Sequence, residues 1–75
     1  MFLSDLSSGD KAVVGVINSG LRLFNRIASM GICEGKSLTV IKNSGSGPVV
    51  IDVNGSRYAI GRGMAQRISV VKLEA

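Results

Sequence analysis

The 75-residue chain contains few residue types that could carry out chemistry, and it contains no histidine at all. Nucleophilic catalysis needs a serine, cysteine or lysine beside a general base, and that base is most often histidine. Cys33 is the single cysteine, so the usual zinc sites built from spaced cysteines and histidines are excluded. We therefore predict that the chain is not an enzyme, and we expect no catalytic residue, metal site or cofactor.

The acidic residues do not form pairs that could do acid/base work. They are scattered through the chain: Asp5, Asp10, Glu34, Asp52 and Glu74. Glycosidase-type catalysis needs two neighbouring carboxylates, and ferrous iron is not expected to bind such dispersed ligands. The stretch Gly61-Arg62-Gly63 has some likeness to a phosphate-binding loop, but it lacks both the P-loop lysine pattern and the Rossmann spacing. We interpret it as a turn or a single helical turn between strands.

Cys33 has two interpretations. The favoured one is a small, half-buried apolar residue, because free cysteine packs like a small hydrophobe. The alternative is a functional thiol, or a metal ligand shared across a dimer.

A lone thiol fits a reducing cytosol, the N-terminus lacks the pattern of a signal peptide, and no apolar run approaches the ~20 residues of a membrane span. We therefore expect a cytoplasmic protein that does not insert into the membrane.

One amphipathic helix is predicted from about Leu21 to Met30, with Ser19 as its N-cap. Its polar stripe consists of Arg22, Asn25, Arg26 and Ser29. Its buried stripe consists of Leu21, Phe24, Ile27 and Ala28, with Leu23 and Met30 at the flank. Gly31 is expected in the left-handed C′ position and Ile32 at C″, where an apolar residue folds back on the last turn.

Five short strands are predicted from β-branched residues and alternation, at 11–17, 36–42, 49–53, 56–60 and 68–73. Gly15 indicates a bulge or a close backbone approach, and Asn54-Gly55 a two-residue type I′ turn. The stretch from Asn43 to Pro48 is expected to be a flexible loop. The predicted fold class is mainly β with one or two short helices. It is a small SH3-like β-barrel with a helical insertion after the first strand, closed to remove exposed strand edges, and forms a single domain over residues 1–75.

The net charge of +4 comes from basic residues spread along the chain, which favours a role in solubility. A nucleic-acid-binding barrel needs a basic groove and stacking aromatic residues. Only Tyr58 and Phe2 remain for stacking, so we do not expect nucleic acid as a partner. The apolar content is high for so short a chain, and exposed apolar patches on small domains mark partner surfaces. Self-association stays open for the same reason.

The helix end reads Arg26-Ile27-Ala28-Ser29-Met30-Gly31-Ile32-Cys33-Glu34-Gly35. This stretch resembles the most characteristic segment of the FeoA family: a helix with a basic residue, a Leu/Met-Gly-aliphatic stop, two variable residues and a glycine. The likeness continues at Leu3, Leu6, Gly9, Val14, Val16, the segment 38–42, Asn54-Gly55, Arg62, Met64, Ala65 and Ile68. The loop between the second and third strands departs from the family, which often has a proline-flanked acidic turn there. Only Pro48 of that pattern is present.

The resemblance implies an accessory role beside FeoB, a membrane permease with a cytoplasmic GTP-binding domain, which would recruit this chain to the inner face of the membrane. We expect the helix and its stop to form the contact, through Arg22, Leu23, Arg26, Met30, Gly31 and Ile32. For the apolar members of this set core packing is the alternative, and for the arginines a solvated face. Two other functions stay open: an SH3-like regulatory module of the kind found in iron-dependent repressors, and, less favoured, a nucleic-acid-binding barrel.

Overall fold

The computed structural model describes residues 1–17 and 20–74, with the side chains of Leu21, Leu23 and Phe24 outside the description. Within these residues, five strands, two α-helices and one 3-10 turn follow one another along the chain. They are η1 (Leu3–Asp5), β1 (Lys11–Ile17), α1 (Leu21–Ser29), β2 (Ser37–Lys42), β3 (Val49–Val53), β4 (Ser56–Ile60), α2 (Arg62–Ala65) and β5 (Ile68–Leu73). The mainly β class and the helical insertion after the first strand are thereby confirmed.

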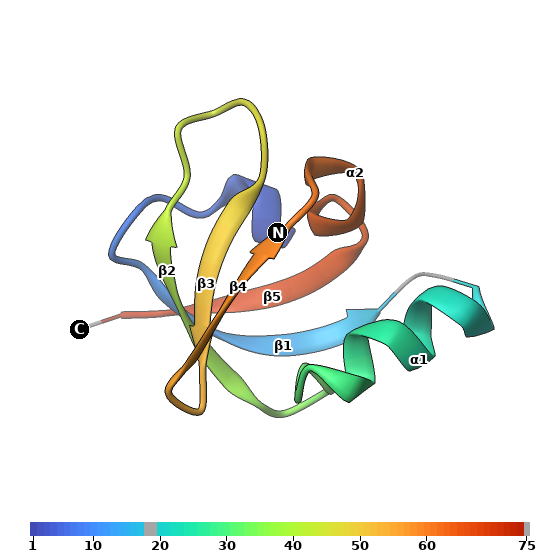
Figure 1. The fold of residues 1–75 in the computed structure, drawn as a ribbon. Coiled ribbons are helices and arrows are strands. Elements are labelled where there is room, and N and C mark those ends of the chain that lie inside the picture. Colours follow the sequence, from blue (N-terminus) through green and yellow to red (C-terminus); the bar gives the residue numbers. More distant parts are fainter. Residues whose placement is uncertain (18–19, 75) are drawn as a thin grey trace.

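The strands form one antiparallel sheet in the order β4-β3-β2-β1-β5. The sheet curls strongly, α1 lies beside the end of β1, and α2 lies between β4 and β5 (Figure 1). The predicted closure of the barrel is wrong, because the hydrogen-bonded order leaves β4 and β5 as the two outer strands. The N-terminal segment occupies part of the outer edge of β5: Phe2 pairs with Ser69, and the Val70 amide donates to the Met1 carbonyl over 2.9 Å. These groups of β5 are therefore used by the N-terminus instead of by β4.

The hairpin of β3 and β4 follows from its local sequence. Asn54 and Gly55 have φ values of 55° and 85°, as a type I′ turn requires, so the predicted turn is confirmed. Alternate residues of β3 are buried, which gives the strand one core face.

Gly15 marks an irregularity in β1. The register between β1 and β5 shifts between Val14 and Ile17, as at a bulge. A Cβ atom at Gly15 would lie 3.4 Å from the Ser69 carbonyl oxygen, so the two backbones approach closely. Both features predicted for this glycine are thus confirmed.

The C-terminal end of α1 is a complete Schellman motif. Gly31 has φ +83°, and its amide donates to the Ala28 carbonyl over 2.9 Å. The Ile32 amide reaches back to the Ile27 carbonyl over 3.3 Å. Ile27 and Ile32 are both completely buried in the same core cluster. The predicted helix stop is therefore confirmed, together with its apolar residue at C″.

The start of α1 and one side of its buried stripe differ from the prediction. The residue before the helix is Gly20, in an extended conformation with φ −68° and ψ 165°, and the predicted N-cap Ser19 lies outside the described residues. Ala28 is exposed, so its predicted burial is wrong; Ile27 occupies the core-facing position of this last turn. The polar stripe is exposed as predicted, at Arg22, Asn25, Arg26 and Ser29.

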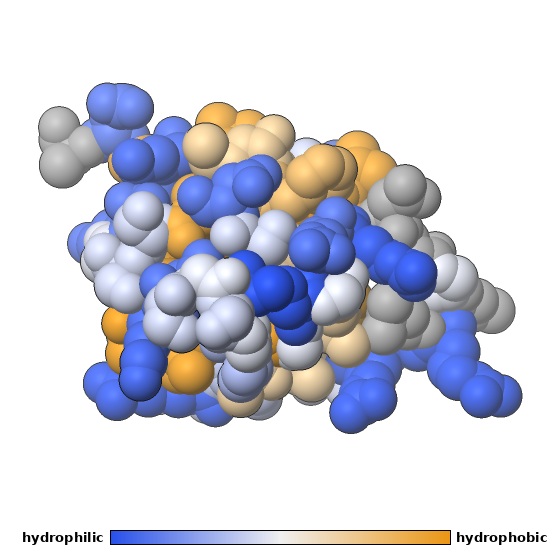
Figure 2. Space-filling view, turned by 90° about the horizontal axis from the view of Figure 1, so that it is seen from above, coloured by the Kyte–Doolittle hydropathy of each residue, from blue (hydrophilic) through white to orange (hydrophobic). Residues whose placement is uncertain are grey.

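The core lies inside the curl of the sheet and contains only apolar side chains among the described residues. Its members are Leu3, Leu6, Ala12, Val14, Ile27, Ile32, Leu38, Val40, Val49, Ile51, Val53, Ile60, Ala65, Ile68 and Val70. Large apolar residues also remain exposed, as predicted: Met1, Phe2, Val16, Ile41, Val71 and Leu73. On the face shown in Figure 2 the hydrophobic residues form separate patches between hydrophilic ones.

Candidate docking surface

The two arginines predicted to contact a partner are exposed on α1. Arg22 and Arg26 lie one helical turn apart on the same face. The ion pair found among the described residues joins Lys72 to Asp10, with 3.6 Å between amine nitrogen and carboxylate oxygen, and lies away from this helix. Both guanidinium groups are therefore available to an anionic partner.

The apolar residues at the helix end have different positions. Met30 is half-buried and packs against the core. Ile32 is completely buried, so core packing describes it and it presents no surface. A Cβ atom at Gly31 would lie 3.5 Å from Asn54 Nδ2, which places the helix end against the β3–β4 turn. The side chain of the remaining predicted residue, Leu23, lies outside the description.

The structure also contains a hydrogen-bond network that the sequence did not reveal, centred on the Asn43 side chain and called the hub below. Asn43 Nδ2 donates to the carbonyls of Ser4 and Leu6 over 3.0 and 2.6 Å. Asn43 Oδ1 accepts from the Gly45 amide over 3.1 Å and from Arg62 Nη2 over 2.7 Å. All the hydrogen-bonding positions of this amide are used, since it has two N–H donors and two lone pairs.

Arg62 extends the hub to the far side of the β2–β3 loop. Its Nε donates to the Gly47 carbonyl over 2.9 Å, and the backbone N–H of Asn43 donates to Ser8 Oγ over 3.0 Å. The loop is therefore held at its base by α2 and by the N-terminal segment, which corrects the expectation of a simply flexible loop. No sequence pattern indicates this, because Asn43 and Arg62 are 19 positions apart.

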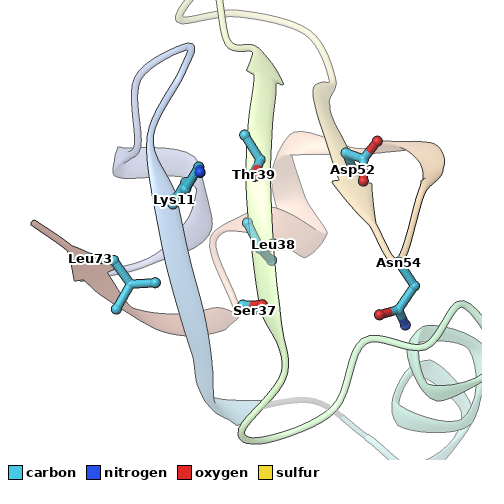
Figure 3. A pocket seen from close by; sticks show the side chains of 7 residues that line it. All are labelled: Lys11, Ser37, Leu38, Thr39, Asp52, Asn54 and Leu73. Carbon is cyan, nitrogen blue, oxygen red and sulfur yellow. The ribbon is translucent and has the colours of Figure 1, made fainter. Parts of the chain in front are cut away.

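An open pocket of about 330 Å³ lies on the outer face of the sheet (Figure 3). Lys11, Thr39 and Asp52 line it from three neighbouring strands, in one cross-strand row. Asp52 Oδ1 accepts the Gly55 amide over 3.1 Å, so this carboxylate stabilises the adjoining turn. The lining contains no histidine or cysteine, and the one side-chain hydrogen bond found for it in the described part of the chain is that of Asp52 to the turn.

The rest of the described chain has no arrangement typical of a metal centre or a membrane span. In residues 1–17 and 20–74, no group of three or more histidine, cysteine, aspartate or glutamate side chains could hold a metal ion. Cys33 is half-buried with a free thiol, as the filler interpretation expects. None of the helices in the described part is long and apolar enough to cross a membrane.

A curled five-stranded sheet with a helix inserted after β1 defines a small SH3-like domain. Residues 1–72 match the FeoA domain family. A protein of Methanocaldococcus jannaschii, named provisionally as Fe(2+) transport protein A, is 42% identical over 72 residues, which are 96% of this chain and 87% of that protein. The chain therefore belongs to the FeoA family.

Solved structures of FeoA proteins are similar throughout the chain. A crystal structure described as an iron uptake regulatory protein, FeoA, superposes with a TM-score of 0.92 and 38% identity, covering 97% of each chain. The Stenotrophomonas maltophilia FeoA complexed with zinc, described as a prokaryotic SH3 domain protein, gives a TM-score of 0.79 and 25% identity, covering 95% of this chain and 89% of that one. The predicted resemblance and the SH3-like fold are both confirmed.

A transcriptional regulator also contains this fold. A manganese-dependent transcriptional repressor gives a TM-score of 0.86 and 25% identity, and the match covers 97% of this chain but 41% of the repressor. The likeness to repressor domains expected from the sequence is therefore confirmed for the fold.

Proposed function

We propose that this chain is an accessory protein of ferrous iron uptake that binds the cytoplasmic GTP-binding part of a FeoB-type permease and modulates iron transport or its GTP cycle. The contact surface in this proposal is the exposed face of α1 with the helix end, that is Arg22, Arg26, Met30 and Gly31, next to Asn54. Ile32 is excluded from the surface because it is completely buried.

The exposed arginine pair on α1 is the observation that most supports this surface. Arginine and methionine are enriched at protein interfaces, and here two arginines lie on α1 and Met30 is the residue that caps its end. Family membership supports the iron-transport role, since the M. jannaschii relative has that function in its name.

A pull-down of the cytoplasmic part of FeoB tests the surface. The test variant is Arg22→Glu/Arg26→Glu, and the matched control is Lys42→Glu/Arg67→Glu, whose residues are exposed elsewhere on the domain. Both double variants lower the net charge equally, so a general electrostatic effect would weaken both. We expect loss of binding at least tenfold larger for the α1 variant. Equal retention of the two variants would remove the helix face from the proposal.

The repressor likeness favours a second candidate, a regulatory module that binds a peptide or another domain of a metal-dependent regulator. The two candidates differ in their expected partner. Retention of FeoB together with no binding to the DNA-binding domain of such a repressor would favour the transport role, and the opposite result would favour the regulator.

A further inference from the structure

The outer edge of β4 has unused backbone groups. Val53 and Ser56 flank the two-residue turn, so they form a mutually hydrogen-bonded pair, and this pattern alternates along the hairpin. The amides and carbonyls of Ser56 and Tyr58 consequently face β3, whereas those of Arg57 and Ala59 face away from it. Both of the latter residues are exposed.

The two outer strands of the sheet are not equivalent. The edge of β5 is covered in part by Met1 and Phe2, whereas β4 pairs only with β3 among the described residues. An open edge is a template for another strand, and proteins usually block it with charges, proline or a bulge. The register of β4 with β3 is continuous, and Arg57 is the only charged residue of the strand.

The single charged side chain at this edge is positive and forms no ion pair among the described residues. Arg57 lies across from Asp52, but that carboxylate holds the Gly55 amide over 3.1 Å and forms no ion pair with Arg57. The chain as a whole has a net charge of +4. A carboxylate placed beside Arg57 on the same face of the sheet would therefore complement it.

We propose that the free edge of β4 binds an extended acidic segment of another protein as an added strand. The segment's carboxylate lies opposite Arg57 on the outer face, and the next residue, an aliphatic one, lies opposite the half-buried Tyr58 on the inner face. Ala59 is small and leaves room for a second acidic side chain beyond the first. This surface is separate from the α1 face and does not rest on the iron-transport proposal.

A second copy of this chain fits the edge less well than an acidic segment. Antiparallel pairing centred on Tyr58 would bring two Arg57 side chains to diagonal positions about 7–8 Å apart on one face. Each copy also has the same positive net charge, which opposes association.

Two seven-residue peptides test the proposal, one alternating glutamate and valine and the other lysine and valine. Titrations are followed by the backbone amide NMR signals of the full chain. We expect shifts centred on Arg57 and Ala59 and a Kd about fivefold or more lower for the glutamate peptide, because one attractive cross-strand charge pair is exchanged for a repulsive one. Absence of binding up to about 1 mM peptide, equal affinity for both peptides, or shifts centred elsewhere would overturn the proposal.

Three variants separate the edge from other surfaces. Arg57→Glu is expected to reverse the preference between the peptides. Ala59→Pro removes an amide that faces away from β3, so it should weaken both peptides at least tenfold while the rest of the spectrum stays dispersed. Arg26→Glu, on α1, should leave the preference unchanged. If the Ala59 variant does not fold, the reversal by Arg57→Glu alone decides the matter. Concentration-dependent protection of the Arg57 and Ala59 amides in the free protein would show a second copy at the edge and refute the acidic-segment proposal.

Discussion

Replacement of Asn43 by alanine tests whether one side chain holds the base of the β2–β3 loop. In the native domain this amide joins the N-terminal segment at Ser4 and Leu6 to Arg62 of α2. Alanine removes the two N–H donors and the acceptor oxygen but leaves the surrounding carbonyls and the guanidinium group in place. The variant therefore measures how much this network stabilises the fold.

The expected loss of stability follows from the burial of the individual bonds. Three of the four side-chain bonds of Asn43 are partly buried, and the bond from the Gly45 amide is exposed. A typical hydrogen bond contributes about 0.5–1.5 kcal/mol net, and exposed groups recover much of that from water. We therefore expect Asn43→Ala to lower the free energy of unfolding by about 2–3 kcal/mol. A 75-residue domain has about 4–11 kcal/mol in total, so the change is large.

Urea unfolding followed by far-ultraviolet circular dichroism measures this loss, since the chain has no tryptophan. In a thermal melt the same change should lower the Tm by about 10–20 °C. Asn43→Asp keeps the acceptor oxygen but replaces the donating NH2 group by a second carboxylate oxygen facing the Ser4 and Leu6 carbonyls, so it should also destabilise. The control is Ser44→Ala, which removes one exposed hydrogen bond to the Ser46 carbonyl and should cost less than about 0.5 kcal/mol. An alanine variant at position 43 that unfolds within about 0.5 kcal/mol of wild type would refute the reasoning.

Two further predictions concern the end of α1. Gly31→Ala should lower the free energy of unfolding by about 1–2 kcal/mol, because φ is +83° and the added methyl group meets Asn54 Nδ2 at 3.5 Å. Gly31→Asn should lower it by less. An unchanged midpoint of urea unfolding for both variants would contradict this prediction. Ile32→Ala should cost about 2–5 kcal/mol by the same urea measurement, because the side chain is completely buried in the core. A loss below about 0.5 kcal/mol would instead mean that Ile32 is surface-exposed in solution.

Much of the secondary structure could be predicted because its causes are local. Alternation placed β3 over Val49–Val53, and Asn54-Gly55 defined the turn that follows it. Gly31 and Ile32 encode the helix stop within two residues, and the observed amide bonds are those that such a stop requires. Each of these features depends on neighbours a few positions away, so the sequence alone contains the relevant information.

The candidate docking surface was only partly predictable, because a stripe on a helix does not say how far each member is covered. Arg22 and Arg26 are exposed as their pattern predicted. Ile32 and Ala28 have opposite environments, buried and exposed, although both are apolar residues at the same helix end. The difference arises from the tertiary position of that last turn against the core.

By itself the sequence determined the class of the fold and the family, since these depend on short-range periodicity and on the order of a few motifs. The tertiary structure decided which edges of the sheet remain open and how the β2–β3 loop is held. Asn43 meets Ser4 and Leu6 across 39 and 37 positions, and β5 pairs with the N-terminus instead of with β4. Such long-range hydrogen bonds depend on the folded arrangement of segments that are far apart in the chain, and no local pattern specifies them.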